Sequence, residues 1–385
     1  MLHDLPLSGV VVVELSDSAS APFAGRVLAA LGADVWKIER PSGDSARGWG
    51  PSKWKGSGAA YHALNRGKRT ISIDIKDRDQ LMTLHQLIAE HADVFMHNLR
   101  PGSCGQYGLD ADSLRVTKPE LVYCEVGAFG HVGPLNTLPG YDPLMQAFSG
   151  IMSITGEEGQ APARAGVSIV DFGTGMWAVI GILSALYRRR VKHCGASVNC
   201  SLLETAIAWM TVGIANYNVD GEPGGRHGSG VAFIAPHRAY ETADGHLIVS
   251  AANDPLFARL CAALGRPEWA LDDRFALNSA RLKHRVELDR LIGERLITEP
   301  RSVWQARLQA AGIPVAPIQT TAEIVGHEQT SALGIIETPP DDEVGLVGLP
   351  LSFDGRRTPA LHAAREIGAD NEVLARMLKT RPERP

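Results

Sequence analysis

The chain has 385 residues, 44% hydrophobic and 21% charged. At about 150 residues per domain, this length predicts two domains, and the composition excludes disorder as the main state. The formal net charge of −5 excludes an overall field that holds nucleic acid or an anionic membrane, so any polyanion must be bound locally.

Strand and helix signals alternate through the first half of the chain. Residues 10–15 form a β-branched run typical of a buried strand, and strand patterns return in residues 34–39, 70–75, 93–99, 121–126 and 196–200. Helical patterns occur in residues 22–32 and 79–91. Residues 167–171 (VSIVD) predict a further strand, with helices over 174–190 and 203–217. This alternation favours an α/β fold with a parallel sheet covered on both faces.

The composition changes at residues 220–230 (DGEPGGRHGSG), which we interpret as a linker or mobile loop. The following residues alternate in the β manner around Asp244 and Gly245, which predicts a hairpin. Helical patterns continue to about residue 312, and residues 315–319 predict a short strand. The second half of the chain therefore differs in architecture from the first.

Several classes of site and location are disfavoured. The five cysteines include no C-x-x-C pair, and no H-E-x-x-H or G-x-S-x-G motif occurs, so we expect free thiols, no metal site and no serine hydrolase. The N-terminus lacks signal-peptide features, and the longest apolar run, residues 176–186, is shorter than the ~20 residues of a membrane-spanning helix. We expect a cytoplasmic protein with no membrane partner.

The sharpest local motif is Asp171 at the end of the predicted strand, followed by Gly173 and Gly175 at the start of a helix. Asp171 is interpreted either as a helix cap with packing glycines or as a carboxylate that the helix dipole holds ionised, free to act as nucleophile or base. A dinucleotide fingerprint is disfavoured, because the carboxylate would meet the pyrophosphate and residues 188–190 are arginines where an acid is expected.

A second motif is the basic segment of residues 37–69, which carries eight Lys or Arg residues against Glu39 and Asp44. The cations flank glycine-rich turns and two tryptophans, Trp49 and Trp54. The segment is interpreted either as a solvated face or as a site for phosphates and a flat ring, which favours a small polyphosphate ligand over nucleic acid.

Together these segments resemble the class III coenzyme A transferases, the family of formyl-CoA, carnitine-CoA and dicarboxyl-CoA transferases. The segments that carry the resemblance are residues 7–15, 31–50, 65–76, 93–102, 140–156, 167–189 and 235–249. The resemblance implies an enzyme of the EC 2.8.3 type that moves coenzyme A from an acyl-CoA to a carboxylic acid and holds no tightly bound cofactor.

The resemblance also implies an interlocked, ring-like homodimer. Each subunit would have a large, Rossmann-like CoA-binding domain and a smaller α+β domain. We place the large domain at residues 1–220, completed by residues 330–385, and the small domain at residues 221–329.

The same resemblance assigns site residues. It places the nucleophile at Asp171 and an active-site tyrosine at Tyr141. The CoA contacts implied are Arg40, Lys68, Arg69, Ile71, Asn98 and Leu99, and the acyl pocket is assigned to Trp49. We add Gly173 and Gly175 to the substrate pocket, where we expect backbone N–H groups to stabilise the tetrahedral oxyanions. Ala19 and Gln106 depart from relatives that have glutamine and arginine at these places.

The implied mechanism proceeds through an aspartyl anhydride and an aspartyl-CoA thioester. Residues 140–156 look closer to succinyl-CoA and other dicarboxylate members, and Arg164, His237 or Arg238 would either hold a distal carboxylate or be surface and turn residues. The alternatives left open are an α-methylacyl-CoA racemase of the same fold, a non-catalytic CoA-binding protein and a dinucleotide-dependent oxidoreductase. A racemase of this type has histidine at the place of Tyr141, and a tyrosine with a pKa near ~10 is a poor base.

Overall fold

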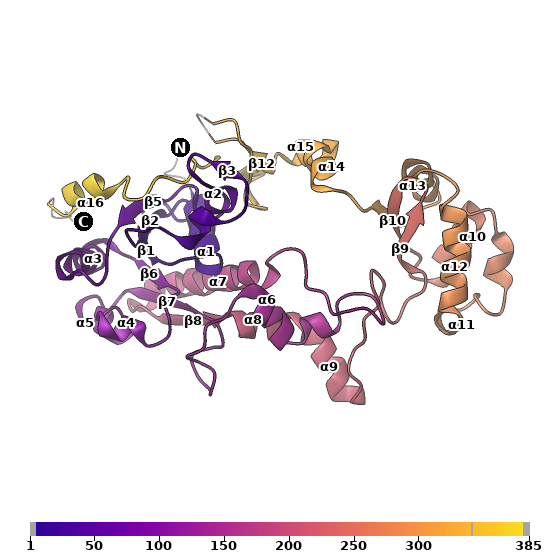
Figure 1. Ribbon diagram of the computed structural model, residues 1–385, viewed down its shortest axis with the longest axis horizontal. Coiled ribbons are helices and arrows are strands. Elements are labelled where there is room, and N and C mark those ends of the chain that lie inside the picture. The colour runs from indigo at the N-terminus through magenta and orange to yellow at the C-terminus, as the bar shows by residue number, and fades with distance from the viewer. Residues whose placement is uncertain (1–4, 340–341, 380–385) are drawn as a thin grey trace. The chain divides into compact units, whose positions relative to one another are not determined.

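The computed structural model describes residues 5–339 and 342–379. These residues form two compact units (Figure 1). Unit 1 contains the described residues of the ranges 1–150, 165–212 and 329–385, and unit 2 contains residues 151–164 and 213–328. Unit 1 therefore draws on both ends of the chain and unit 2 on its middle.

Unit 1 is built on a six-stranded parallel sheet with the order β5-β2-β1-β6-β7-β8. Its strands are β1 (Val11–Leu15), β2 (Asp34–Glu39), β5 (Arg69–Ser72), β6 (Val94–His97), β7 (Val122–Gly127) and β8 (Ser197–Ser201). Counted along the chain, this is the 3-2-1-4-5-6 order of the Rossmann fold, whose topological switch point lies between β1 and β6. The prediction of an α/β fold with a parallel sheet is confirmed.

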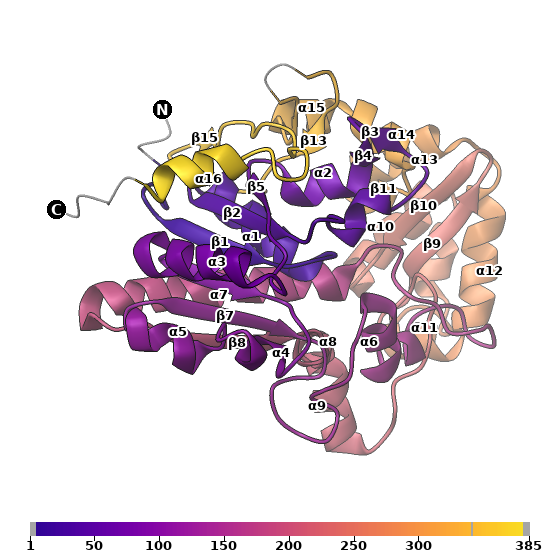
Figure 2. The ribbon, with the colours of Figure 1, turned by 60° about the vertical axis from the view of Figure 1, so that its left-hand side comes forward.

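Helices cover both faces of this sheet (Figure 2). Val12 of β1 packs in the core that includes α1 and α7, and Val13 packs in the core that includes α3, α5 and α16. Successive residues of a strand point to opposite faces, so a strand covered on both sides is apolar at most positions. The covering helices are α1 (Ser20–Ala30), α7 (Ile169–Lys192), α3 (Arg78–His91), α5 (Ala111–Thr117) and α16 (Asn371–Met377).

The strand predicted just before Asp171 is wrong, because α7 begins at Ile169 and Asp171 is its third residue. Ser168 makes no side-chain cap bond to the helix. Instead, the carboxylate of Asp142 accepts hydrogen bonds from the N–H groups of Val170 and Asp171. A cap supplied by another part of the chain satisfies the first-turn donors and lets the helix start here.

Helix α7 is, within residues 5–339 and 342–379, the one helix long and apolar enough by length and composition to cross a membrane. Packing inside unit 1 explains part of the apolar composition of α7. Ala178, Ile182 and Ala185 are buried in the core of unit 1, whereas Met176 and Ile180 are exposed.

Shorter elements complete unit 1. A single helix was predicted over residues 203–217, but two helices meet at Met210, α8 (Leu202–Trp209) and α9 (Thr211–Asp220), the second of which enters unit 2. The other helices are α2 (Ala59–Asn65), α4 (Ser103–Gln106), α6 (Asp142–Phe148) and α15 (Glu328–Leu333), with a 3-10 turn at Ser45–Gly48. Two-residue strands form the pairs β3 (Lys53–Trp54) with β4 (Ser57–Gly58), β12 (Ile336–Glu337) with β13 (Leu346–Val347), and β14 (Ser352–Phe353) with β15 (Arg356–Arg357).

Unit 2 has a three-stranded antiparallel sheet with the order β11-β10-β9. The hairpin predicted around Gly245 is confirmed by β9 (His237–Thr242) and β10 (Gly245–Ser250), and β11 spans Val315–Pro317. Leu247, Phe257 and Trp304 lie in its core. Its helices are α10 (Asp254–Ala263), α11 (Asn278–Lys283), α12 (Arg285–Leu296), α13 (Arg301–Ala310) and α14 (Thr321–Gly326), with 3-10 turns at Ile151–Ser153 and Pro267–Leu271.

Candidate active site

A cavity of about 860 Å³ opens in unit 1 where the parallel strands end. Its walls are the turns that follow β1, β2, β5, β6 and β7, together with residues 138–141, Asp171 and Leu202. In open α/β sheets ligands bind outside the carboxyl ends of the strands at the switch point. The sheet order alone therefore marks this cavity as the candidate site.

The cavity gathers only some of the residues that the sequence assigned to a site. Six line it: Arg40, Trp49, Asn98, Leu99, Tyr141 and Asp171. Five lie outside its lining: Lys68, Arg69, Ile71, Gly173 and Gly175. The assigned nucleophile, tyrosine and tryptophan thus share one cavity with three of the assigned CoA contacts.

Asp171 lies in the first turn of α7 and is partly buried. Burial, together with the negative charge of Asp142, raises the pKa of Asp171 to about 7. The expectation that the helix dipole holds this carboxylate ionised is therefore wrong, because Asp142 occupies the N–H groups of Val170 and Asp171 and adds a like charge. Near neutral pH, Asp171 exists in both protonation states.

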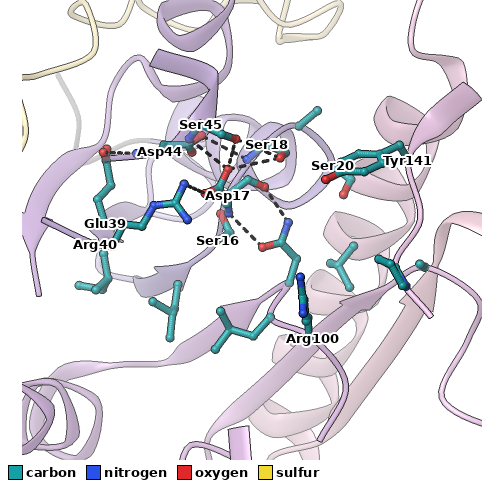
Figure 3. A pocket seen from close by; sticks show the side chains of 18 of the residues that line it. Ser16, Asp17, Ser18, Ser20, Glu39, Arg40, Asp44, Ser45, Arg100 and Tyr141 are labelled. Carbon is teal, nitrogen blue, oxygen red and sulfur yellow. Dashed lines mark hydrogen bonds and ion pairs between the residues drawn. The ribbon is translucent and has the colours of Figure 1, made fainter. Parts of the chain in front are cut away.

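Tyr141 and Trp49 present aromatic side chains to the same cavity. Tyr141 is 64% exposed and precedes α6 as its N-cap residue, and Trp49 is 38% exposed. The phenol of Tyr141 is a hydrogen-bond donor or acceptor. In the close-up of Figure 3, Tyr141 lies beyond Ser20, on the other side of the β1 turn from Arg40.

Arg40 and Asp17 form a polar cluster in the cavity (Figure 3). The Arg40 Nη2 lies 3.0 Å from Asp17 Oδ2, and its Nε donates to the Gly43 carbonyl at 2.9 Å. Two further exposed cations in the lining, Lys76 and Arg100, were missed by sequence reasoning. The signal that marks Lys76 and Arg100 is their place just after predicted strands, since carboxyl ends of parallel strands meet at one edge.

Asn98 joins the turns after β1 and β6. Its Oδ1 accepts from the Asp17 N–H at 3.0 Å, and its Nδ2 donates to the Asp17 carbonyl at 2.7 Å. The neighbouring His97 accepts from the Leu99 N–H at 3.3 Å and pairs with the Tyr123 hydroxyl at 2.6 Å. Burial lowers the pKa of His97 to about 4, so a neutral ring fixes this part of the wall.

Comparison with known proteins bears on what this cavity binds. CoA-transferase family III matches residues 7–371. The succinate–glutarate CoA-transferase of Agrobacterium fabrum is 36% identical over 362 residues, which cover 92% of this chain and 90% of that protein. The succinyl-CoA:glutarate CoA-transferase of Mus musculus is 33% identical and covers 90% and 79%, respectively. A CAIB/BAIF family protein from Brucella suis has a crystal structure with a TM-score of 0.90 at 35% identity, covering 97% and 99% of the two chains.

The chain belongs to CoA-transferase family III. The family assignment predicted from the sequence is confirmed, and with it an enzyme that transfers coenzyme A. The substrates of such a CoA-transferase are CoA thioesters and carboxylic acids.

Most of the basic segment serves the fold of this CoA-transferase. The Nζ of buried Lys37 lies 3.3 Å from Glu14 Oε1 and 2.8 Å from Asp44 Oδ2, and the Nζ of buried Lys68 lies 2.8 Å from Glu14 Oε2. Burial opposes a charge on Lys37, but Glu14 and Asp44 outweigh it and raise its pKa. Burial lowers the pKa of Lys68 to about 8. These four groups balance their charges inside the protein.

The other assigned residues outside the lining also have structural partners. The Nε of Arg69 lies 2.8 Å from Asp34 Oδ1, and Ile71 is buried in the core on the α3 face. A Cβ on Gly173 would lie 2.6 Å from the Trp209 ring, and one on Gly175 would lie 2.6 Å from a backbone oxygen of α1. Both glycines permit close helix packing.

The three candidates for a distal carboxylate lie in unit 2 of this CoA-transferase. Arg238 Nη1 is 3.1 Å from Asp289 Oδ2, and His237 Nδ1 is 2.8 Å from the Ser250 hydroxyl. Arg164 is exposed. The Arg238 and His237 side chains therefore have polar partners within unit 2.

Proposed function

We propose that this enzyme transfers coenzyme A from succinyl-CoA or another dicarboxyl-CoA to a carboxylic acid, with Asp171 as the covalent nucleophile. The observation that carries the proposal is the partly buried carboxyl of Asp171 in a cavity that also contains Tyr141 and Arg40. The dicarboxylate substrates are supported by the relatives, which include transferases acting on glutarate and, in Chloroflexus aurantiacus, on D-citramalate.

The chemistry requires a single nucleophile. A carboxylate oxygen of Asp171 attacks the thioester carbonyl, the C–S bond breaks, and CoA thiolate and a mixed anhydride form. The thiolate then attacks the aspartyl carbonyl, which releases the donor acid and leaves an aspartyl-CoA thioester. The acceptor carboxylate attacks this thioester to give a second anhydride, and the thiolate attacks its acyl carbonyl to form the new acyl-CoA and restore Asp171.

Two features of the cavity support this sequence of steps. The partial burial of Asp171 shields one side of its carboxyl from water, which would hydrolyse the anhydride. Tyr141 is placed to donate a hydrogen bond to an oxyanion of the tetrahedral intermediates. At the strand ends, Arg40, Lys76 and Arg100 supply the cations for the phosphates of CoA.

A panel of CoA donors and acid acceptors tests the function. We expect transfer from succinyl-CoA to glutarate and similar diacids, without exchange of the α-proton of a 2-methylacyl-CoA, because Tyr141 replaces the histidine base of a racemase. Transfer is measured by CoA exchange, and the α-proton by NMR in D2O without acceptor acid. Deuterium incorporation at a catalytic rate, lost in His131→Ala, would favour the racemase.

We also infer that two chains associate. Large apolar side chains of unit 1 are exposed on α7, α8 and the residues beyond, namely Met176, Trp177, Ile180, Ile207, Trp209 and Val212. The centroids of the Trp177 and Trp209 rings lie 6.4 Å apart, so the exposed groups of α7 and α8 adjoin at this pair. Sedimentation equilibrium is expected to give twice the chain mass, and Trp177→Glu to weaken the association. A wild-type chain that sediments as a monomer at micromolar concentration would contradict the dimer.

A further inference from the structure

Asp142, which directly follows the active-site tyrosine, is a buried carboxylate that holds the start of another helix. It is 2% exposed, and its Oδ2 accepts hydrogen bonds from the N–H groups of Val170 at 2.7 Å and Asp171 at 3.1 Å. These N–H groups belong to the first turn of α7, which has no side-chain cap of its own. The Asp142 carboxylate is therefore hydrogen-bonded to the backbone of the assigned nucleophile, Asp171.

The carboxylate of Asp142 is itself fixed. Its Oδ1 accepts from the Gln146 side-chain amide at 2.5 Å, and the Oε1 of fully buried Gln146 accepts from the Ala165 N–H at 2.9 Å. Pro143 follows Asp142 at the start of α6 and restricts the backbone there. Helix α6 thus binds two adjacent parts of the chain, the segment at Ala165 that precedes α7 and the first turn of α7 itself.

We propose that Asp142 is a positioning residue for CoA transfer, which orients Asp171 by accepting hydrogen bonds from the first turn of α7 and places a like charge behind its carboxyl. The proposal rests on the proposed function for its effect on catalysis. Asp142 is the next residue after Tyr141, which lines the cavity, and it is hydrogen-bonded to the backbone of Asp171. It therefore fixes the tyrosine and the nucleophile relative to each other.

The electrostatic part follows from the groups around the nucleophile. The elements packed against α7 include α1, α6, α8, β7 and β8. Arg26 on α1 contacts a backbone carbonyl, Glu204 on α8 accepts from the Ser201 hydroxyl, and Glu125 on β7 interacts with His131. The other titratable groups are the phenols and thiols of Tyr123, Cys124, Cys200 and Tyr141. The charge that acts on Asp171 is therefore that of the Asp142 carboxylate. It raises the pKa of Asp171, as burial also does.

This arrangement favours the covalent intermediates. Ionised Asp171 is repelled by the charge of Asp142, whereas the anhydride and the thioester are neutral at the aspartyl group and are not. Destabilising the ionised nucleophile relative to the neutral acyl-enzyme lowers the cost of the first attack. The same bonds from Asp142 keep the carboxyl directed into the cavity.

The test separates charge from position. Asp142→Asn retains an oxygen for the two N–H groups but removes the charge, so the titration midpoint of Asp171 is expected to fall by at least ~0.5 pH unit. The midpoint is read by NMR on resting enzyme labelled with 13C at aspartate carboxyls, with the signal identified by its loss in Asp171→Asn. This measurement needs no substrate, so it stands even if the proposed function fails.

The effect of losing the hydrogen bonds from the first turn of α7 to Asp142 is measured by steady-state kinetics. Asp142→Ala is expected to lower kcat by ~10–100-fold. The KM for the CoA donor should stay within ~threefold, because the side chains proposed to bind the phosphates of CoA are unchanged. Asp110→Asn is the matched control, since Asp110 caps α5 through the Ser113 N–H at 3.0 Å and lies outside the cavity lining. It should change neither the midpoint nor kcat.

Asp142→Glu keeps the charge on a longer side chain and serves as a further variant where Asp142→Asn does not fold. It is expected to lower kcat while leaving the midpoint close to that of the wild type. An unchanged midpoint in Asp142→Asn, or a wild-type kcat in Asp142→Glu, would overturn the proposal.

Discussion

Replacing Asp171 by asparagine is expected to lower CoA transfer by ~10³-fold or more, because an amide cannot form the aspartyl anhydride. Intact-mass analysis after mixing with an acyl-CoA should detect a covalent adduct in the wild type that the variant lacks. Binding of CoA to Asp171→Asn should be retained, since the cations of the strand ends remain. Transfer at an undiminished rate by the variant would remove Asp171 from the mechanism.

The pH dependence of the first step provides an independent measure of Asp171. Only the carboxylate attacks, so with a pKa of about 7 the rate of adduct formation should rise ~tenfold per pH unit below neutrality and level off above pH 7. An aspartate with the ordinary pKa of ~3.9 would give a flat profile over this range. Rapid-quench mass analysis between pH 5 and 9 distinguishes the two profiles.

The same pKa has a consequence for stability. The folded state holds the proton of Asp171 more tightly than the unfolded state, so its contribution to stability is lost as pH rises from about 4 through about 7. Asp171→Asn removes this ionisation and should therefore raise the midpoint of thermal unfolding at pH 8, but not at pH 4, relative to the wild type.

The sheet was predictable because its strands are buried on both faces. Val12 and Val13 point to opposite cores, so consecutive positions of β1 are apolar up to the buried Glu14, which is typical of a parallel strand. The register was not predictable from the run itself. It pairs Glu14 with Lys37 on adjacent strands, and only this register reveals that a lysine of the basic segment neutralises a buried acid rather than binding a phosphate.

The candidate site was predictable only in part, for a similar reason. Asp171 is marked by its local motif and Tyr141 by the family resemblance, whereas the influence of Asp142 on Asp171 acts through space between segments 29 residues apart. Local sequence at residues 167–171 favours a strand, and the cap from Asp142 reverses that preference. Propensity is a weak prior that a tertiary contact overrides.

The second large effect is expected from the contrast between two cations of the basic segment. Lys37→Met removes an ion-pair partner of two buried carboxylates, so Asp44 loses its ion pair with Lys37 while Glu14 retains Lys68. Leaving buried charges unpaired costs about 3–5 kcal/mol of unfolding free energy, which urea denaturation measures as a lower midpoint. Arg40→Ala is the matched variant, because its guanidinium is exposed in the cavity and its ion pair with Asp17 contributes at most ~1 kcal/mol.

For CoA affinity we expect the opposite order, with Arg40→Ala as the variant that shows the larger effect. A charge-assisted hydrogen bond contributes roughly 1.5–3 kcal/mol, so Arg40→Ala should weaken CoA about tenfold or more in calorimetry, while its unfolding midpoint stays near that of the wild type. Loss of Arg40 should also narrow the difference in affinity between CoA and dephospho-CoA if it faces the ribose phosphate. Equal CoA affinities for wild type and Arg40→Ala would assign the phosphates to Lys76 and Arg100 instead, and a Lys37→Met variant as stable as the wild type would mean that the buried carboxylates are not held as charges.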